Sequence, residues 1–320
     1  MKVLVTGASG LLGTHVVLAL QQQGIPVRAM VRTRNKYLLN PHSGTEVITG
    51  DLTDARMVKC AVAGCTHIIH AAALTCTNEP RYQQYYRVNV EATVTLAEVA
   101  AQAHVQRMVY VSTANTIGFG SMQYPGTEVH AMRAPFTRMG YARSKQTAEQ
   151  SLEKHASQLD VVTVHPTFML GAYDAGNSSG QIVRMVLGKR IIFYPPGGKN
   201  FAPVVDVAQG IIRALLLGKR NEHYLLANEN TSYRNFYKRL CRISNQQAWL
   251  VPVPGWLLFM VGVLGSGLQW AGVRTSLTLA NMKALCVHNY YDNTKAKKEL
   301  GIVFTSVDKA MEDAVTWFKR

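Results

Sequence analysis

The chain has 320 residues, of which 48% are hydrophobic and 17% charged, a composition ordinary for a globular protein and long enough for one large or two modest domains. Its 34 Lys and Arg outnumber its 19 Asp and Glu, so its surface should attract anions such as nucleotide phosphates, nucleic acids or acidic lipid headgroups. The basic residues occur as scattered pairs and not in runs, which argues against nucleic-acid binding.

The five cysteines show neither a CxxC pair nor a His-rich spacing, so the sequence predicts no metal site and no disulfide framework. The chain begins MKVLVTGASG, which enters a strand directly and lacks the features of a secretory signal. We therefore expect reduced thiols and a cytoplasmic protein.

The first half alternates short β-branched runs with longer helical patterns, which is typical of a parallel sheet with helices on both faces. We predict strands at residues 2–6, 27–31, 46–49, 67–70, 108–112 and 161–165, and helices at 11–23, 54–62, 83–103 and 141–155. The fold class is therefore α/β, a Rossmann doubly wound sheet. We expect this domain over residues 1–165, with return segments around 203–227, and a smaller, mainly helical domain over 166–320.

The first predicted strand runs into GASGLLG, residues 7–13, and a helical pattern follows at once. Gly7 permits the tight turn, Gly10 lets the backbone approach a pyrophosphate, and Gly13 lets the helix pack closely on the strand. The helix N-terminus then offers N–H groups to the phosphate. The alternative is a glycine-rich structural turn. The residues expected to bind a dinucleotide here are Gly7, Ser9, Gly10, Leu11, Leu12 and Gly13.

The second predicted strand ends without an acidic residue, although NAD sites place a carboxylate there to bind the ribose 2′-hydroxyl. Arg32 follows that strand and could bind a 2′-phosphate, with Arg34 or Lys36 as a second cation. The sequence therefore favours NADP(H) over NAD(H) as the cofactor, and the alternative is a solvated basic surface.

Tyr141 and Lys145 lie four residues apart at the start of a predicted helix, so they share one helix face. A neighbouring ammonium favours the phenolate and lowers the pKa of a tyrosine. The spacing therefore predicts a tuned acid-base pair, and the alternative is an ordinary helix surface.

Seven segments of the chain occur in the order found in a known family. They are TGASGLLG (6–13), GDLTD (50–54), HIIHAAA (67–73), NVEAT (89–93), VSTANTIG (111–118), YARSK (141–145) and HPTFMLG (165–171). In these motifs the chain resembles the extended short-chain dehydrogenase/reductases. More narrowly, it resembles the dihydroflavonol-reductase-like and 3β-hydroxysteroid-dehydrogenase-like branch, whose bacterial members are commonly labelled epimerase/dehydratase. The resemblance is strong to about residue 210.

The resemblance implies that Thr113 holds the reacting carbonyl oxygen, that Tyr141 donates the proton, and that Lys145 also binds the nicotinamide ribose. It assigns Asn89 to structural support. His165 departs from the family's usual Asn or Arg, and we favour a packed strand-end histidine. The further residues that the resemblance places at the cofactor are Asp51, Leu52, Ala71, Ala72, Ala73 and Pro166.

These observations predict an oxidoreductase that reduces a ketone or aldehyde with NADPH, or oxidises the corresponding alcohol. One alternative is a nucleotide-sugar epimerase or dehydratase with bound NAD, against which Arg32 argues. Another is a non-catalytic Rossmann binding protein, which the set of Thr113, Tyr141 and Lys145 disfavours. A small-molecule carbonyl or alcohol is the expected partner, and a homodimer is compatible with the sequence.

Residues 256–268, WLLFMVGVLGSGL, carry no charge and are too few to span a membrane. We expect this segment to be buried or to form an apolar wall over the substrate site, which would suit a hydrophobic substrate. Peripheral membrane contact is the less favoured alternative.

Overall fold

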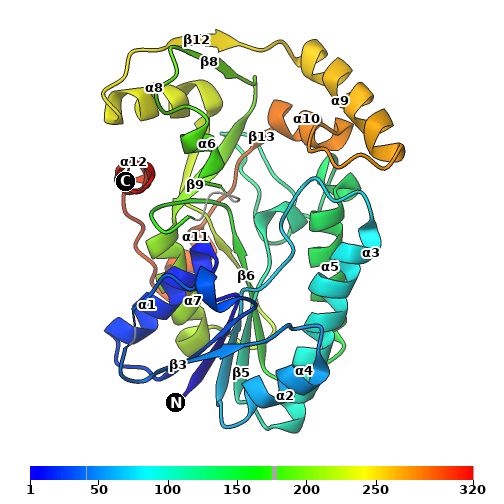
Figure 1. Cartoon of the computed structure of the whole chain (residues 1–320), viewed down its shortest axis with the longest axis vertical. Coiled ribbons are helices and arrows are strands. Elements are labelled where there is room, and N and C mark those ends of the chain that lie inside the picture. The colour runs from blue at the N-terminus through cyan, green and yellow to red at the C-terminus, as the bar shows by residue number, and fades with distance from the viewer. Residues whose placement is uncertain (41, 175–178, 320) are drawn as a thin grey trace.

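The computed structural model describes residues 1–40, 42–174 and 179–319, and a seven-stranded parallel sheet forms its centre (Figure 1). Its strands are β1 (Val3–Thr6), β2 (Val27–Val31), β3 (Thr45–Thr49), β4 (His67–His70), β5 (Arg107–Val111), β6 (Val161–Pro166) and β10 (His223–Leu226). In space they follow the order β10-β6-β5-β4-β1-β2-β3. The order reverses between β1 and β4, and a doubly wound sheet binds ligands at the carboxyl ends of its strands at such a point.

Helices cover both faces of the sheet, as the sequence predicts. One face carries α1 (Leu11–Gln22) and α7 (Val204–Leu217), which pack on each other. The opposite face carries α2 (Ala55–Val62), α4 (Ala92–Gln102) and α5 (Gly140–Glu153) (Figure 1). Buried aliphatic side chains fill both interfaces. The inner strands are covered on both sides, which explains why their sequences are apolar runs and not alternating patterns.

The predicted strands and helices of the first half agree with the structure to within two residues, except for one helix. The predicted helix over residues 83–103 divides into α3 (Tyr82–Tyr85), a π-helical turn η2 (Tyr86–Glu91) and α4. The wider turn places Asn89 inward, where its side chain is buried. The hydrophobic pattern of the sequence does not reveal a single π-helical turn, because the segments before and after the turn are both α-helical.

Beyond β6 the chain is mainly helical, as expected, and it also contains short strands. The helices are α6 (Gln181–Arg184), α8 (Tyr233–Ile243), α9 (Gly255–Trp270), α10 (Leu279–Cys286), α11 (Thr294–Leu300) and α12 (Val307–Phe318). The strands are β7 (Phe168–Leu170), β8 (Ile191–Tyr194), β9 (Gly198–Pro203), β11 (Glu229–Ser232), β12 (Trp249–Pro252) and β13 (His288–Asn289). β9 pairs with β7, β11 and β13, and β8 pairs with β12. α7 and β10 return to the central sheet, as the sequence allows.

Helix α9 differs from expectation, because most of its large side chains are exposed. Gly262 and Gly265 are its buried residues. A Cβ at Gly262 would lie 2.8 Å from the Cα of Leu279, and a Cβ at Gly265 would collide with the carbonyl oxygen of Leu277. The prediction that residues 256–268 are buried is wrong, since α9 makes its close contact through two residues that have no side chain. Among the described helices, none is both long and apolar enough to cross a membrane.

Candidate active site

The turn after β1 forms a cradle that leaves no room for side chains. Gly7 has a φ of +68°, and a Cβ there would lie 2.7 Å from the amide nitrogen of Ala72. A Cβ at Gly13 would collide with the carbonyl oxygen of Gly7. In the described structure no side chain caps α1 at Gly10, and its first turn contains no acidic residue. The turn therefore fits a dinucleotide pyrophosphate, because uncapped N–H groups and the helix dipole favour an anion.

Ser9, Leu11 and Leu12 complete this turn in different environments. Ser9 is half-buried beside the exposed Gly10. The side chains of Leu11 and Leu12 are buried in the core between α1 and the sheet. These two leucines can therefore contact a phosphate only through their backbone N–H groups.

Arg32 follows β2 directly and is exposed at the carboxyl edge of the sheet. Asp51 follows the neighbouring strand β3, and its carboxylate accepts hydrogen bonds of 2.9 Å from both the N–H and the hydroxyl of Thr53. The backbone N–H of Thr53 is the main cause that holds the pKa of Asp51 below its usual value, and the charges of Arg32 and Arg87 add to it. A cation and an ionised carboxylate thus lie together at the ends of β2 and β3.

Two neighbours of this edge point elsewhere. Leu52 is half-buried and packs against the core beneath α2 and α4. Arg34 begins the short helix η1 (Arg34–Lys36), and its guanidinium lies over the ring of Tyr37, 5.4 Å from the ring centre. Arg32 is therefore a better candidate than Arg34 for the contact with a 2′-phosphate.

The segment after β4 lies against the glycine-rich turn. The N–H of Ala72 donates to the hydroxyl of Thr6 at 3.3 Å, and Ala71 to Ala73 are half-buried. Asn89 accepts from the N–H of Leu74 at 2.7 Å and donates to the hydroxyl of Ser144 at 2.9 Å. Asn89 thus joins the cofactor edge of the sheet to α5, which agrees with the supporting role that the resemblance implies.

Thr113, Tyr141 and Lys145 come together at the carboxyl end of β5 and the first turns of α5. The side chains of Thr113 and Tyr141 form a hydrogen bond. Burial raises the pKa of Tyr141 to about 12, and the hydrogen bond with Thr113 opposes this shift only in part. The phenol is therefore neutral near pH 7, which is the form that can donate a proton.

Lys145 corrects one sequence-based expectation. Its ammonium donates to the carbonyl oxygen of Val111 at 2.6 Å and lies over the ring of Tyr110, 4.1 Å from the ring centre. Burial lowers the pKa of Lys145 to about 7. The expectation that Lys145 lowers the pKa of Tyr141 is wrong for this arrangement, because the ammonium is directed toward β5 and desolvation dominates the phenol.

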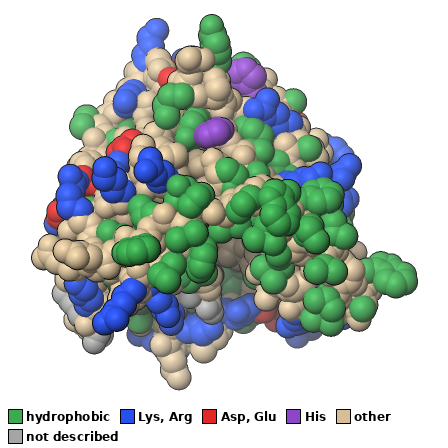
Figure 2. All heavy atoms as spheres, turned by 90° about the horizontal axis from the view of Figure 1, so that it is seen from above, with side chains coloured by type: hydrophobic (Ala, Val, Ile, Leu, Met, Phe, Trp, Pro, Cys, Tyr) green, Lys and Arg blue, Asp and Glu red, His purple; other side chains and the backbone are tan. Residues whose placement is uncertain are grey.

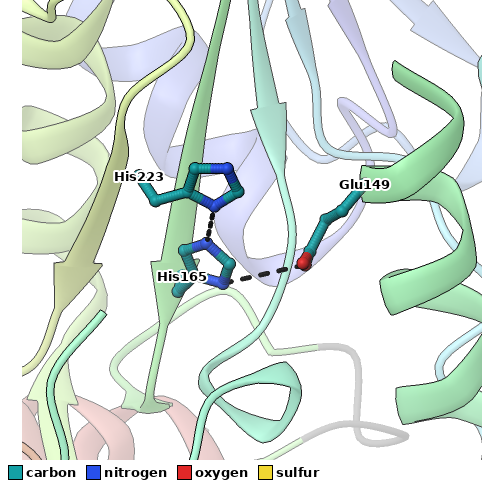
Figure 3. Close-up of side chains that lie close together, drawn as sticks. All are labelled: Glu149, His165 and His223. Atoms are coloured by element: carbon teal, nitrogen blue, oxygen red, sulfur yellow. Dashed lines mark hydrogen bonds and ion pairs between the residues drawn. The ribbon is translucent and has the colours of Figure 1, made fainter. Parts of the chain in front are cut away.

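A buried polar network supports the backbone around Thr113, and Figure 3 shows its three titratable members. Glu149 reaches from α5 toward His165 on β6, with 3.7 Å between Oε1 and Nδ1. The Nε2 of His165 lies 2.9 Å from the Nδ1 of His223 on β10. The hydroxyl of Thr116 bridges the network, since it lies 2.9 Å from Glu149 Oε1 and 3.1 Å from His165 Nδ1.

Burial governs the protonation of this network. Burial lowers the pKa of His165 to about 4 and also lowers that of His223, while it raises the pKa of Glu149. His165 is thus a buried strand-end histidine, as the sequence favours. Sequence reasoning missed Glu149 and His223. Glu149 could have been found four residues after Lys145 on the same helix face, whereas nothing local marks His223.

Tyr141 also lines a surface pocket between α5 and the C-terminal helices. The opposite wall includes Gln269 at the end of α9, and Thr278 and Asn281 at the start of α10. The pocket therefore borders on α10 and the last turn of α9, and residues 256–268 do not line it. Pro166 is buried at the end of β6.

Comparison with known proteins places this geometry in context. The model of the NAD dependent epimerase/dehydratase family matches residues 3–227. A putative dihydroflavonol 4-reductase of Synechocystis is 31% identical, over 98% of this chain and 94% of that protein. The 4-hydroxy-2-methyl-3-oxo-4-farnesyl-3,4-dihydroquinoline-1-oxide ketoreductase of Stigmatella aurantiaca is 31% identical, over 94% of this chain and 91% of that protein. The crystal structure of gox2253 has a TM-score of 0.84 at 27% identity, covering 99% of this chain and 98% of that one.

Proposed function

Because the chain belongs to the NAD-dependent epimerase/dehydratase family, and within it is an oxidoreductase of the extended short-chain type, we propose that it reduces a ketone or aldehyde with NADPH. The observation that carries this proposal is the phenol of Tyr141, which lines a surface pocket and is hydrogen-bonded to Thr113. A neutral phenol held by a second hydroxyl is suited to donate a proton to a carbonyl oxygen as charge develops on it.

The chain's own residues divide the work as follows. The turn of Gly7, Gly10 and Gly13 would hold the pyrophosphate, and a bound nicotinamide would supply the hydride. Thr113 and Tyr141 orient the carbonyl oxygen by hydrogen bonds. Tyr141 then transfers its phenolic proton to that oxygen, so that the product is the alcohol. Oxidation of the alcohol runs through the same groups in reverse.

Lys145 has a positioning role toward the ribose and the backbone of β5. Its ammonium is bonded to Val111 at 2.6 Å, and a pKa of about 7 lets it gain or lose a proton near neutral pH. Lys145 would hold the ribose of a bound cofactor, and with this pKa it could return a proton to Tyr141 after each turnover.

For the substrate, we propose a ketone with a mainly apolar body. Tyr82, Met139 and Ala280 give the pocket beside Tyr141 an apolar part. The charged side chains of Glu79, Arg138 and Arg143 also line it. The ketoreductase of Stigmatella aurantiaca is named for a farnesylated ketone, which is consistent with this class.

Cofactor preference tests the NADP(H) part of the proposal. Arg32 is exposed at the edge where the 2′-phosphate would lie, and a charge-assisted hydrogen bond contributes about 1.5 to 3 kcal/mol. We expect fluorescence titration to give a Kd for NADPH about tenfold or more below that for NADH. Arg32→Ala should remove most of this difference.

The matched control is Arg234→Ala, which removes the same charge from an exposed position on α8. It should leave the ratio of the two dissociation constants unchanged. Equal affinity of the unmutated protein for NADPH and NADH would contradict the assignment of Arg32.

A further inference from the structure

Helix α9 exposes its hydrophobic side chains along its whole length. Trp256 near its start is 65% exposed, Leu264 is 70% exposed, and Trp270 at its end is 93% exposed. The helix already has its partner within the chain, because Gly262 and Gly265 pack on the segment around α10. The exposed side chains of α9 therefore do not need a further packing partner from within this chain.

The exposed surface continues onto the small two-stranded sheet at the same end of the molecule (Figure 1). Trp249 of β12 is 81% exposed and is paired in register with Ile191 of β8, which is also exposed. Phe193, two residues along β8, points to the same side of the strand and is 65% exposed. We call the exposed hydrophobic side chains of α9, together with Ile191, Phe193 and Trp249, the apolar cap.

The two stretches of chain that form the apolar cap carry charge of one sign. Residues 175–205 and 230–291, which include β8, α8, β12, α9 and α10, contain no Asp or Glu, but four Lys or Arg in the first stretch and six in the second. The rest of the chain has 34 − 10 = 24 Lys and Arg against all 19 Asp and Glu. Two thirds of the net charge of +15 thus comes from these two stretches.

Most of these cations are available at the surface. Lys189 and Arg190 are exposed immediately before β8, and the ammonium of Lys283 lies 5.6 Å from the ring centre of Phe259 on α9. Only Arg239, Arg242 and Arg274 form ion pairs within the described residues, in each case with carboxylates from outside the two stretches. Figure 2, which views this end of the molecule, shows hydrophobic side chains gathered in a broad patch with Lys and Arg around it and few acidic groups.

We propose that the apolar cap seats the protein on the surface of an anionic lipid bilayer. Large contiguous apolar patches on a protein surface mark interaction sites. A helix with aromatic side chains at both ends, bordered by cations and free of acids, matches the interface of a bilayer, where tryptophan rings insert among headgroups and cations meet phosphates. A second copy of the chain would bring two cationic surfaces together, which disfavours it as the occupant.

Vesicle flotation tests this proposal without depending on catalysis or cofactor. The full-length protein is mixed with vesicles of phosphatidylcholine alone, or of phosphatidylcholine with phosphatidylglycerol in equal parts. We expect at least tenfold stronger binding to the anionic vesicles at low salt, and loss of most of that difference at ~0.5 M salt, where charges are screened. No flotation, or equal flotation with both vesicles, would overturn the proposal.

Two pairs of variants separate insertion from charge. Leu264→Asp should reduce binding at least tenfold, whereas Val303→Asp, which alters an equally solvent-facing residue outside the cap, should not. The double variant Lys189→Glu and Arg190→Glu should also weaken binding, whereas the matched double variant Lys297→Glu and Lys298→Glu on α11 should weaken it less. Circular dichroism and urea unfolding of each variant confirm that the fold is intact.

Analytical sedimentation of the protein without vesicles tests whether a second copy of the chain covers the apolar cap. A dimer of the unmutated protein that Leu264→Asp dissociates, combined with failure to float, would assign the apolar cap to a second copy of the chain and overturn the proposal. A monomer, or a dimer that persists in Leu264→Asp, together with flotation of the unmutated protein, supports it.

Discussion

At Tyr141 and Lys145, burial changes protonation more than the distance between the two residues does. The phenol is held neutral, with a pKa raised to about 12, while the ammonium has a pKa lowered to about 7. Each shift follows from the cost of placing a charge in a poorly hydrated site. The neutral phenol of Tyr141 can therefore donate a proton to a carbonyl oxygen, which suits reduction.

Removal of the phenolic hydroxyl should stop the chemistry and leave binding intact. We expect Tyr141→Phe to lower kcat about a thousandfold, because general acid catalysis contributes about 10² to 10⁴, while the Kd for NADPH changes less than about twofold. Steady-state kinetics and fluorescence titration measure the two effects.

The control is Tyr82→Phe, which removes a phenolic hydroxyl from the same pocket and leaves the hydrogen bond between Tyr141 and Thr113 in place. It should change kcat only a few-fold. Lys145→Ala, in contrast, should impair both kcat and cofactor binding. If Tyr141→Phe kept about a tenth of normal kcat, another group would be the acid.

At the scale of the element, α10 depends on two glycines of its neighbour α9 for its position. Gly265→Ala would place a methyl group against the carbonyl oxygen of Leu277, a backbone atom that cannot move without α10. Because Thr278 and Asn281 of that segment line the pocket, we expect a raised KM and a loss of about 1 to 3 kcal/mol of unfolding free energy. Urea unfolding and substrate titration measure both.

Gly267→Ala is the matched control, since no atom lies within 4 Å of a Cβ at that position of the same helix. It should stabilise the protein by about 0.5 to 1 kcal/mol, because glycine is a poorer helix former than alanine. Equal effects of the two substitutions would mean that α9 and α10 are not in close contact.

Element types were predictable wherever a segment's own pattern determines its structure. β2 over Val27–Val31 and α1 from Leu11 have periodicities that specify them locally, and the structure agrees. β13 is two residues long and exists only because it pairs with β9, so no local pattern marks it. For α9, composition indicates that apolar surroundings are required. Composition does not tell whether the rest of the protein or a membrane supplies these apolar surroundings.

The candidate site shows the same division between local and distant information. Gly7, Gly13, Tyr141 and Lys145 lie in short motifs, and these could be named from spacing alone. The direction of the Lys145 ammonium depends on the Val111 carbonyl, which comes from another strand. Spacing along a helix cannot supply this information, and the pKa of the tyrosine was therefore predicted in the wrong direction.

At the scale of the whole molecule, the buried His70 makes the stability of the fold depend on pH. His70, at the carboxyl end of β4, is fully buried, with Nδ1 2.7 Å from the hydroxyl of Thr6 and Nε2 2.9 Å from that of Thr93. Burial lowers its pKa to about 3. An unfolded histidine has a pKa of about 6.5, so below that pH the unfolded chain binds a proton that the folded chain does not. Stability should therefore fall as the pH falls from about 6.5 toward 3.

We expect this residue to contribute about 2 kcal/mol to the loss of unfolding free energy between about pH 7 and about pH 5. His70→Gln, which retains two hydrogen-bonding groups, should show a loss smaller by that amount in urea unfolding at the two pH values. His42→Gln, at an exposed position, should behave like the unmutated protein. An equal loss in His70→Gln would show that this histidine does not titrate on unfolding.

Helix α7 packs on α1, although nearly 200 residues of chain separate them, and β10 closes the edge of the sheet beside β6 only after α7 has been made. During synthesis, the first six strands therefore leave the ribosome before the helix that covers part of one of their faces exists. That face stays open to water, and to other nascent chains, until the chain has been made through Leu217. Because this pairing joins distant parts of the sequence, incomplete chains expose apolar surface through which they can associate with one another. The central sheet can therefore bury this face only once α7 has been made, and a fragment that ends at residue 165 would expose the apolar surface that α7 covers.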